Sequence, residues 1–175
     1  VRAVCFSEIP YHLGLPSVHD EDRFWDPFFT ACEETDTVVC MHIGSSSRMP
    51  ATSGDAPVAV AASLSFNNSM ASLSDWLFSG KLVQFPKLKI AYSEGQIGWL
   101  PYILERVDDV ARPGIGRVEH VLVELRLCDR EPLHHGPVAV LAVVRQRDAR
   151  EPEIAQRILD ELALLGLQST AFVVE

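Results

Sequence analysis

The sequence lacks the features that mark several common classes of protein. Its longest apolar runs, such as residues 137–144, are far too short to cross a bilayer, so no membrane segment is expected. The opening residues carry neither a long apolar stretch nor a cleavage signature, so they do not read as a signal peptide. No Gly-x-Ser-x-Gly elbow, phosphate loop or Gly-x-Gly-x-x-Gly turn follows a strand pattern. Serine hydrolases and the common nucleotide-binding folds are therefore disfavoured.

Basic residues and paired cysteines are also scarce. The chain has 15 Lys and Arg against 24 Asp and Glu, which gives a net charge of −9. An acidic chain has no general attraction for phosphate backbones, so nucleic acid is not expected as a partner. The four cysteines, Cys5, Cys32, Cys40 and Cys128, include no Cys-x-x-Cys pair. This scatter predicts reduced, mostly buried thiols in a cytoplasmic protein.

The remaining composition is that of a globular protein. The 175 residues are 47% hydrophobic and 22% charged, which is enough for one domain with a sizeable core. The opening residues already have the pattern of a buried strand. Because a domain rarely opens within a strand, we expect that an N-terminal part precedes this sequence.

The first 110 residues alternate between strand and helix patterns. Strands are predicted at residues 2–6, 37–42 and 88–92, each followed by a helical pattern. The run 37–42 is continuously apolar and rich in β-branched residues, which is typical of a strand buried on both faces. Such alternation predicts parallel strands with right-handed crossovers. Both an open doubly wound sheet and a closed (β/α) barrel satisfy it.

Three helices are predicted from the spacing of their apolar residues. The first begins at Asp26 as N-cap, with Pro27 at the first helical position. Gly80 is expected to end the second helix. The faces predicted to be buried are Phe28, Ala31 and Cys32 in the first helix, Phe66, Met70, Leu73 and Leu77 in the second, and Leu100, Ile103, Leu104 and Val107 in the third.

The composition changes near residue 111. From Arg112 onward the chain has eight Arg but no Lys, Trp, Tyr or Asn. Two apolar runs at 118–127 and 138–144, a helix at 151–165 and a final strand at 170–174 still have the patterns of αβ structure. We therefore divide the chain into residues 1–110 and a divergent αβ tail, 111–175.

Polar side chains stand where each predicted strand of the first part ends. Glu8 follows the first strand, His42 ends the second, and Glu94 follows the third. The carboxyl ends of parallel strands share one edge, where sites form in parallel αβ folds. His42 is either a ligand of a divalent ion such as zinc or a core histidine bonded to a carbonyl.

The other polar residues at this edge also have two interpretations. Glu8 and Glu94 can serve as ligands, as a general base or as partners of His42, or they accept backbone N–H groups of their own turns. Ser45, Ser46 and Ser47 can contact a substrate carboxylate, although loop serines are commonly solvated. His12 and His19 lie in a polar loop and are expected at the surface.

Whole phrases of the first part resemble a known family. They lie at residues 3–20, 25–47 and 85–99, and include Val39-Cys40-Met41-His42-Ile43-Gly44 and Ala91-Tyr92-Ser93-Glu94-Gly95. Over about residues 1–110 the chain is similar to the central part of the amidohydrolase-related family, which includes decarboxylases of the aminocarboxymuconate-semialdehyde type. The resemblance implies a (β/α)8 barrel, a divalent metal that is usually zinc, and hydrolysis or non-oxidative decarboxylation of a small carboxylic or cyclic substrate.

The resemblance also implies roles for individual residues. His42 matches the family's mid-barrel metal histidine, and Glu94 falls near the place where many members carry a catalytic histidine. Glu94 is therefore predicted to be catalytic. The predicted substrate contacts are Glu8, Ser45, Ser46 and Trp99.

Two family motifs are missing from the sequence. The His-x-His pair of the first family strand is absent, and so is a Thr-Asp-Tyr-Pro-like phrase with the late aspartate ligand. One histidine cannot hold a catalytic zinc, which needs about three protein ligands.

The predicted fold is thus α/β: a partial, TIM-barrel-like (β/α) arrangement of parallel strands, an incomplete barrel with a divergent tail. Two functional hypotheses follow. The chain is a truncated or incomplete metal-dependent hydrolase or decarboxylase, or it is a catalytically inactive half-barrel that acts as a binding or oligomerisation module. Because a slice of a barrel leaves open sheet edges, a homo-oligomer is expected in either case.

Overall fold

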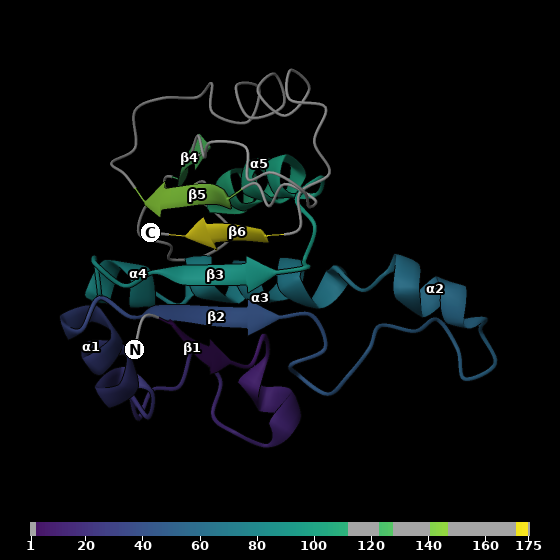
Figure 1. Cartoon of the computed structure of the whole chain (residues 1–175), viewed down its shortest axis with the longest axis horizontal. Helices are drawn as coiled ribbons and strands as arrows, with labels where there is room; N and C mark the ends of the chain where they lie inside the picture. Colours follow the sequence, from purple (N-terminus) through teal and green to yellow (C-terminus); the bar gives the residue numbers. More distant parts are fainter. Residues whose placement is uncertain (1–2, 112–122, 128–140, 147–170, 175) are drawn as a thin grey trace, which may run out of the picture.

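The first part of the chain is an alternating α/β unit (Figure 1). The computed structural model describes residues 3–111, 123–127, 141–146 and 171–174. Three of its strands, β1, β2 and β3, are mutually parallel, as predicted, and they do not close into a barrel. The elements in chain order are β1 (Ala3–Phe6), the 3-10 helix η1 (Pro10–Leu13), α1 (Asp26–Glu34), β2 (Val38–His42), α2 (Val58–Ser63), α3 (Asn67–Phe78), α4 (Lys81–Gln84), β3 (Ile90–Ser93), α5 (Leu100–Ala111), β4 (Val123–Leu127), β5 (Leu141–Gln146) and β6 (Ala171–Val174).

Strands from the predicted tail extend the same sheet. The strand order is β1-β2-β3-β6-β5-β4, so the last strand of the chain lies beside β3. β6 runs antiparallel to β3 and parallel to β5, while β4 and β5 are antiparallel. The two apolar runs predicted in the tail overlap β4 and β5, and the predicted final strand overlaps β6. The helix predicted at 151–165 lies outside the described residues.

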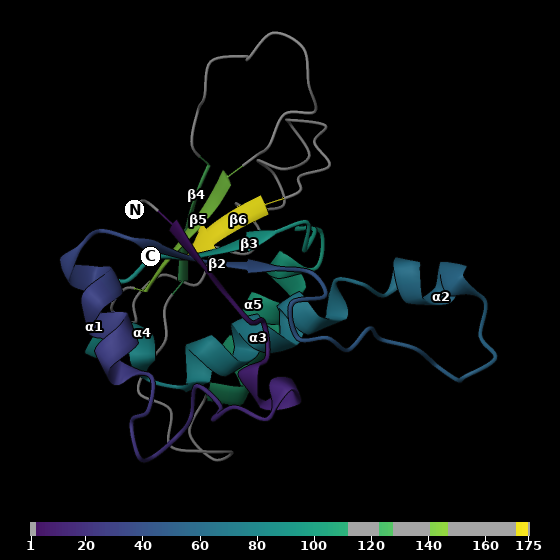
Figure 2. The same ribbon diagram turned by 60° about the horizontal axis from the view of Figure 1, so that its bottom comes forward.

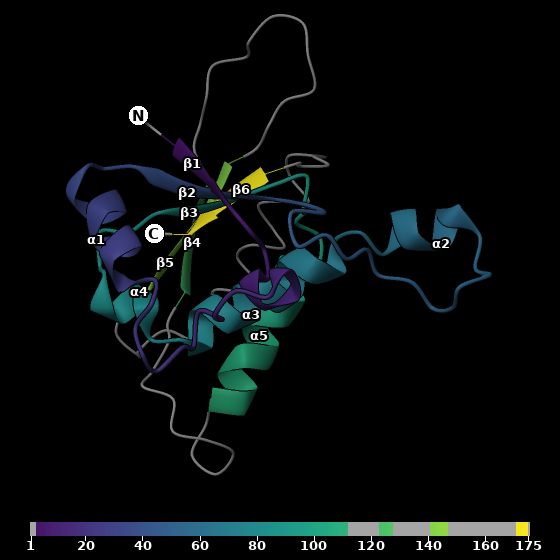
Figure 3. The same cartoon turned by 90° about the horizontal axis from the view of Figure 1, so that it is seen from below.

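Helices cover one face of the three parallel strands. Figures 2 and 3 show α1, α3, α4 and α5 gathered on the same side of β1, β2 and β3. Alternate strand residues point toward them and are buried, and these are Phe6, Val39, Met41, Ile90 and Tyr92. On β2, Val38 and Cys40 point the other way and are only half-buried. The prediction that this strand is buried on both faces is therefore wrong, because the described helices cover only one of them.

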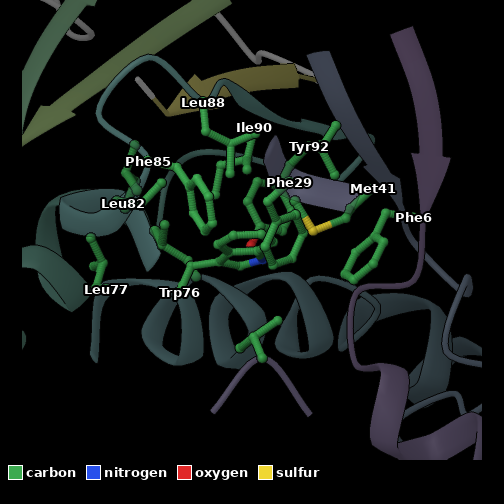
Figure 4. Packing of buried hydrophobic residues seen from close by; sticks show 14 of the residues in the cluster. Phe6, Phe29, Met41, Trp76, Leu77, Leu82, Phe85, Leu88, Ile90 and Tyr92 are labelled. Carbon is green, nitrogen blue, oxygen red and sulfur yellow. The ribbon is translucent and has the colours of Figure 1, made fainter. Parts of the chain in front are cut away.

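The core between sheet and helices is rich in aromatic side chains (Figure 4). Phe29 of α1 lies at its centre and is fully buried. Its ring centroid is 5.1 Å from that of Trp76, 5.8 Å from that of Phe6 and 5.9 Å from that of Phe85. One side chain thus joins α1, β1, α3 and the segment after α4.

The first helix differs from its prediction in two respects. Trp25 occupies the N-cap position, and Asp26 is the first helical residue. The Asp26 carboxylate accepts hydrogen bonds from Lys81 Nζ and, at 2.6 Å, from Gln84 Nε2, so it is not a helix cap. The buried face contains Phe29 and Cys32, whereas Ala31 is exposed. The prediction is thus confirmed for Cys32 and wrong for Ala31, while Phe28 is half-buried and its neighbour Phe29 is fully buried.

The other two helical predictions are confirmed in part, since Phe66, Met70 and Ile103 are only half-buried. The segment after Pro57 forms two helices, α2 and α3, and α3 buries Leu73 and Leu77 as predicted. In α5, Leu100, Leu104 and Val107 are buried, again as predicted. Within the described ranges, no helix has both the length and the apolar character needed to cross a membrane.

Candidate functional site

The polar ends of the three parallel strands meet at one edge of the sheet. The Ser7 hydroxyl donates a hydrogen bond to the Ser45 carbonyl over 3.1 Å, and Glu8 N–H donates to Ser45 Oγ over 2.9 Å. His42 and Ser93 are register partners on β2 and β3, which brings Glu94 beside His42. The prediction that these strand ends share one edge is confirmed.

The second ring nitrogen of His42 faces Glu94. Its Nδ1 lies 2.8 Å from the Ile43 carbonyl oxygen. A carbonyl only accepts, so Nδ1 carries the hydrogen. The other nitrogen, Nε2, lies 3.5 Å from Glu94 Oε2, and each side chain is 57% exposed. With the hydrogen on Nδ1, the lone pair of Nε2 faces the Glu94 carboxylate, and two such donor atoms can bind one metal ion.

Glu94 is held in an uncommon backbone conformation. Its φ is 60°, in the left-handed region that few residues other than glycine adopt. The turn that follows is fastened by a hydrogen bond of 2.7 Å from Trp99 Nε1 to the Gly95 carbonyl. Trp99 itself is buried. The indole thus holds the turn that presents the Glu94 carboxylate.

Glu8 lies in the protein interior and fastens three segments together. Its side chain accepts hydrogen bonds from the Ser69 hydroxyl at 2.5 Å and from Gly44 N–H at 3.1 Å. Only 2% of the residue is exposed. Burial raises the pKa of the carboxyl group, although the bonds from Ser69 and Gly44 and the nearby His42 oppose this. Glu8 therefore joins β1 to the loop after β2 and to the first turn of α3.

The serine loop after β2 is bonded to the same helix. Ser46 is fully buried, and its Oγ accepts a hydrogen bond of 3.1 Å from Asn68 Nδ2. The same amide donates to the Arg48 carbonyl. Ser45 is half-buried and is bonded to the end of β1. Sequence reasoning missed Asn68 and Ser69, because polar residues in a helical pattern give no sign that they face a strand end.

The His42 and Glu94 pair has the spacing of two metal ligands but does not make a complete site. Two ligands about 2.1 Å from a tetrahedral zinc ion stand roughly 3.4 Å apart, close to the 3.5 Å between Nε2 and Oε2. No group of three or more His, Cys, Asp or Glu side chains in the described ranges could hold a metal ion. The described residues therefore fall short of the three protein ligands that a catalytic zinc normally needs.

The chain belongs to the amidohydrolase family. The family model for amidohydrolase matches residues 12–166, which is most of the sequence and extends well past residue 110. Members have a TIM-barrel-type fold, with which the open sheet of three parallel strands is consistent as part of a barrel. Divalent metals are common in the family, and its chemistry is of the hydrolase or lyase type. No curated protein matches the chain.

The close packing of Gly95 against Ser69 leads to a prediction. A Cβ atom at position 95 would lie 2.7 Å from Ser69 Oγ and 2.9 Å from Ser69 Cβ. The Gly95→Ala substitution must displace Ser69, which bonds Glu8, and we expect a loss of about 1–3 kcal/mol in the free energy of unfolding. Urea denaturation measures this loss. Gly98→Ala is the matched control, since nothing lies within 4 Å of its added Cβ. Equal stability of the two variants would contradict the prediction.

Proposed function

We propose that this chain carries the site of a metal-dependent hydrolase or non-oxidative decarboxylase that acts on a small carboxylic or cyclic substrate. The observation that carries the proposal is the His42 and Glu94 pair, which lies at the carboxyl edge of parallel strands in a member of a hydrolase family. Sites of such folds lie at this edge. A likeness to decarboxylases of the aminocarboxymuconate-semialdehyde type is part of the same proposal.

The residues at the edge have different roles in this proposal. His42 is the position for a divalent ion, with zinc as the expected metal, because its Nδ1 is hydrogen-bonded while the lone pair of Nε2 faces Glu94. When bound, such an ion supplies a Lewis acid. As general base, the exposed Glu94 carboxylate accepts the proton of the attacking water in hydrolysis. Ser45 contacts the substrate, while the buried Glu8, Ser46 and Trp99 hold the loops that surround it.

Zinc binding by the whole chain tests the metal position. The protein is dialysed against zinc chloride, and bound zinc per chain is measured by mass spectrometry. We expect His42→Ala to weaken zinc binding at least 10-fold. His19→Ala is the matched control, because His19 also pairs with a carboxylate, that of Asp75 at 3.1 Å, but lies in a surface loop. Undiminished binding by His42→Ala, or none by the unaltered chain, refutes the metal role.

Activity assays test the role of Glu94. The zinc-loaded chain is screened for release of carbon dioxide from small aromatic acids and for hydrolysis of small cyclic amides and lactones. Glu94→Gln keeps the size of the side chain but removes the base, and we expect a fall in kcat of about 100-fold or more. Glu105→Gln, an exposed change on α5, is the control. If neither reaction is detected, the catalytically inactive binding module is the better description.

The proposal includes a small-molecule substrate and self-association. β1 and β4 lie at the two ends of the described sheet. An open edge strand offers unpaired N–H and C=O groups to another chain. Light scattering measures the mass in solution, and a monomer mass counts against self-association.

A further inference from the structure

Two cysteines lie side by side on the sheet face opposite the described helices. Cys5 of β1 and Cys40 of β2 are register partners in a parallel pair. Their chain neighbours Phe6 and Met41 point into the core beneath the sheet, so the two thiols point to the opposite side. Figures 2 and 3 show that the described helices gather on the core side.

The surroundings of this pair leave it accessible. Cys5 is exposed and Cys40 is half-buried. Ala91 of β3 is the register partner of Cys40 on its other side, and Ala3 precedes Cys5 on the same face. Both neighbours are small.

The geometry suits a bridging ion better than a disulfide. Neighbouring strands lie about 4.8 Å apart, and side chains of an in-register parallel pair project side by side. Their Cβ atoms are then roughly 5 Å apart, beyond the range of about 3.5–4.5 Å that disulfides prefer. Two sulfur atoms bound to one ion at about 2.3 Å stand roughly 4 Å apart, which side chains at this spacing reach without strain.

We propose that Cys5 and Cys40 form a dithiol site for a soft, thiophilic d10 cation of the Cu(I) class. Thiolate ligands select such ions over the harder cations that prefer oxygen. Binding forms two sulfur–metal bonds and releases the two thiol protons to solvent, with no change in oxidation state. Cys40 and His42 lie two residues apart on the same face of β2, and the His42 and Glu94 pair differs in offering nitrogen and oxygen donors.

Competition for Cu(I) tests the site. The whole chain, with Cys128→Ser throughout, is titrated without oxygen against the chromophoric Cu(I) chelator bicinchoninate. We expect one Cu(I) per chain and at least 100-fold weaker binding after Cys5→Ser or Cys40→Ser. Cys32→Ser is the matched control, because Cys32 is buried in α1 away from this face. His42→Ala is expected to retain Cu(I), which separates this site from the proposed zinc position.

Two outcomes of the Cu(I) titration would contradict the proposal. Failure of the Cys128→Ser chain to take Cu(I) from the chelator, or undiminished binding by Cys5→Ser, rules the site out. Circular dichroism establishes that each variant is folded. Since Cys5 is exposed, Cys5→Ala provides a second test if the serine variant does not fold.

Discussion

Replacement of Phe29 by alanine is expected to lower the free energy of unfolding by about 3–5 kcal/mol. The side chain is fully buried, and its ring packs against Phe6, Trp76 and Phe85. Truncation removes the apolar contacts and leaves a cavity among rigid rings, which cannot close around it. Urea denaturation followed by tryptophan fluorescence measures the loss.

A matched control lies five residues earlier in the chain. Phe24 is also aromatic and also contacts Trp25, but it is 55% exposed. We expect Phe24→Ala to cost less than about 1 kcal/mol, because little apolar area returns to water. A loss for Phe29→Ala no greater than for Phe24→Ala would show that the described core is not the one that stabilises the protein.

The Lys81→Met variant is expected to lose about 3 kcal/mol of stability. Lys81 Nζ donates to Asp26 Oδ1, and these side chains are only 8% and 11% exposed. Removing one partner leaves a buried carboxylate with less compensation, and such changes cost about 3–5 kcal/mol. Gln84 and Arg23 still bond Asp26, which places the expected loss at the lower end.

The control and the double variant make this prediction specific. Lys89 pairs with Asp36 at 2.6 Å, but those side chains are 33% and 80% exposed. Lys89→Met is therefore expected to cost at most about 1 kcal/mol. The double change Asp26→Leu with Lys81→Met removes both buried charges, and we expect it to recover most of the lost stability. A double variant less stable than Lys81→Met alone contradicts this account.

The same ion pair predicts how stability depends on pH. Burial raises the pKa of Asp26, but hydrogen bonds from Lys81, Gln84 and Arg23 outweigh it and lower the pKa from 3.8 to about 2. The stability that the ionised carboxylate contributes is complete above about pH 4 and is lost as the pH falls toward 2. Denaturation between pH 2 and 5 measures this slope. In Lys81→Met the slope should be shallower.

The spacing of apolar residues along the chain was enough to predict the buried face of one helix but not of another. The apolar residues of α5 recur at helical intervals, so its buried face could be predicted without knowledge of its neighbours. In α1, the adjacent residues Phe28 and Phe29 both lie at a helical spacing from Cys32. Spacing alone therefore does not decide which of the two is buried. Only the position of the sheet decides that Phe29 is fully buried while Phe28 is half-buried.

Long-range partners explain what local patterns missed. Asp26 has the sequence signature of a helix cap, but Lys81, 55 residues later, takes its carboxylate. Glu8 was predicted to face a substrate, yet its partner Ser69 lies 61 residues away. The meeting of His42 with Glu94 could be predicted, because the carboxyl ends of parallel strands share an edge whatever the loops between them do.

The position of β6 bears on the order in which the chain folds. Neighbouring parallel strands β2 and β3 join segments that a single crossover separates, whereas the β3–β6 pair joins Ser93 to Ala171, 78 residues apart. Closing the longer loop costs more entropy before any contact repays it. We therefore expect the three parallel strands and their helices to assemble first. The antiparallel addition of β6 would then follow on an already formed template, as a late step that completes the outer side of β3.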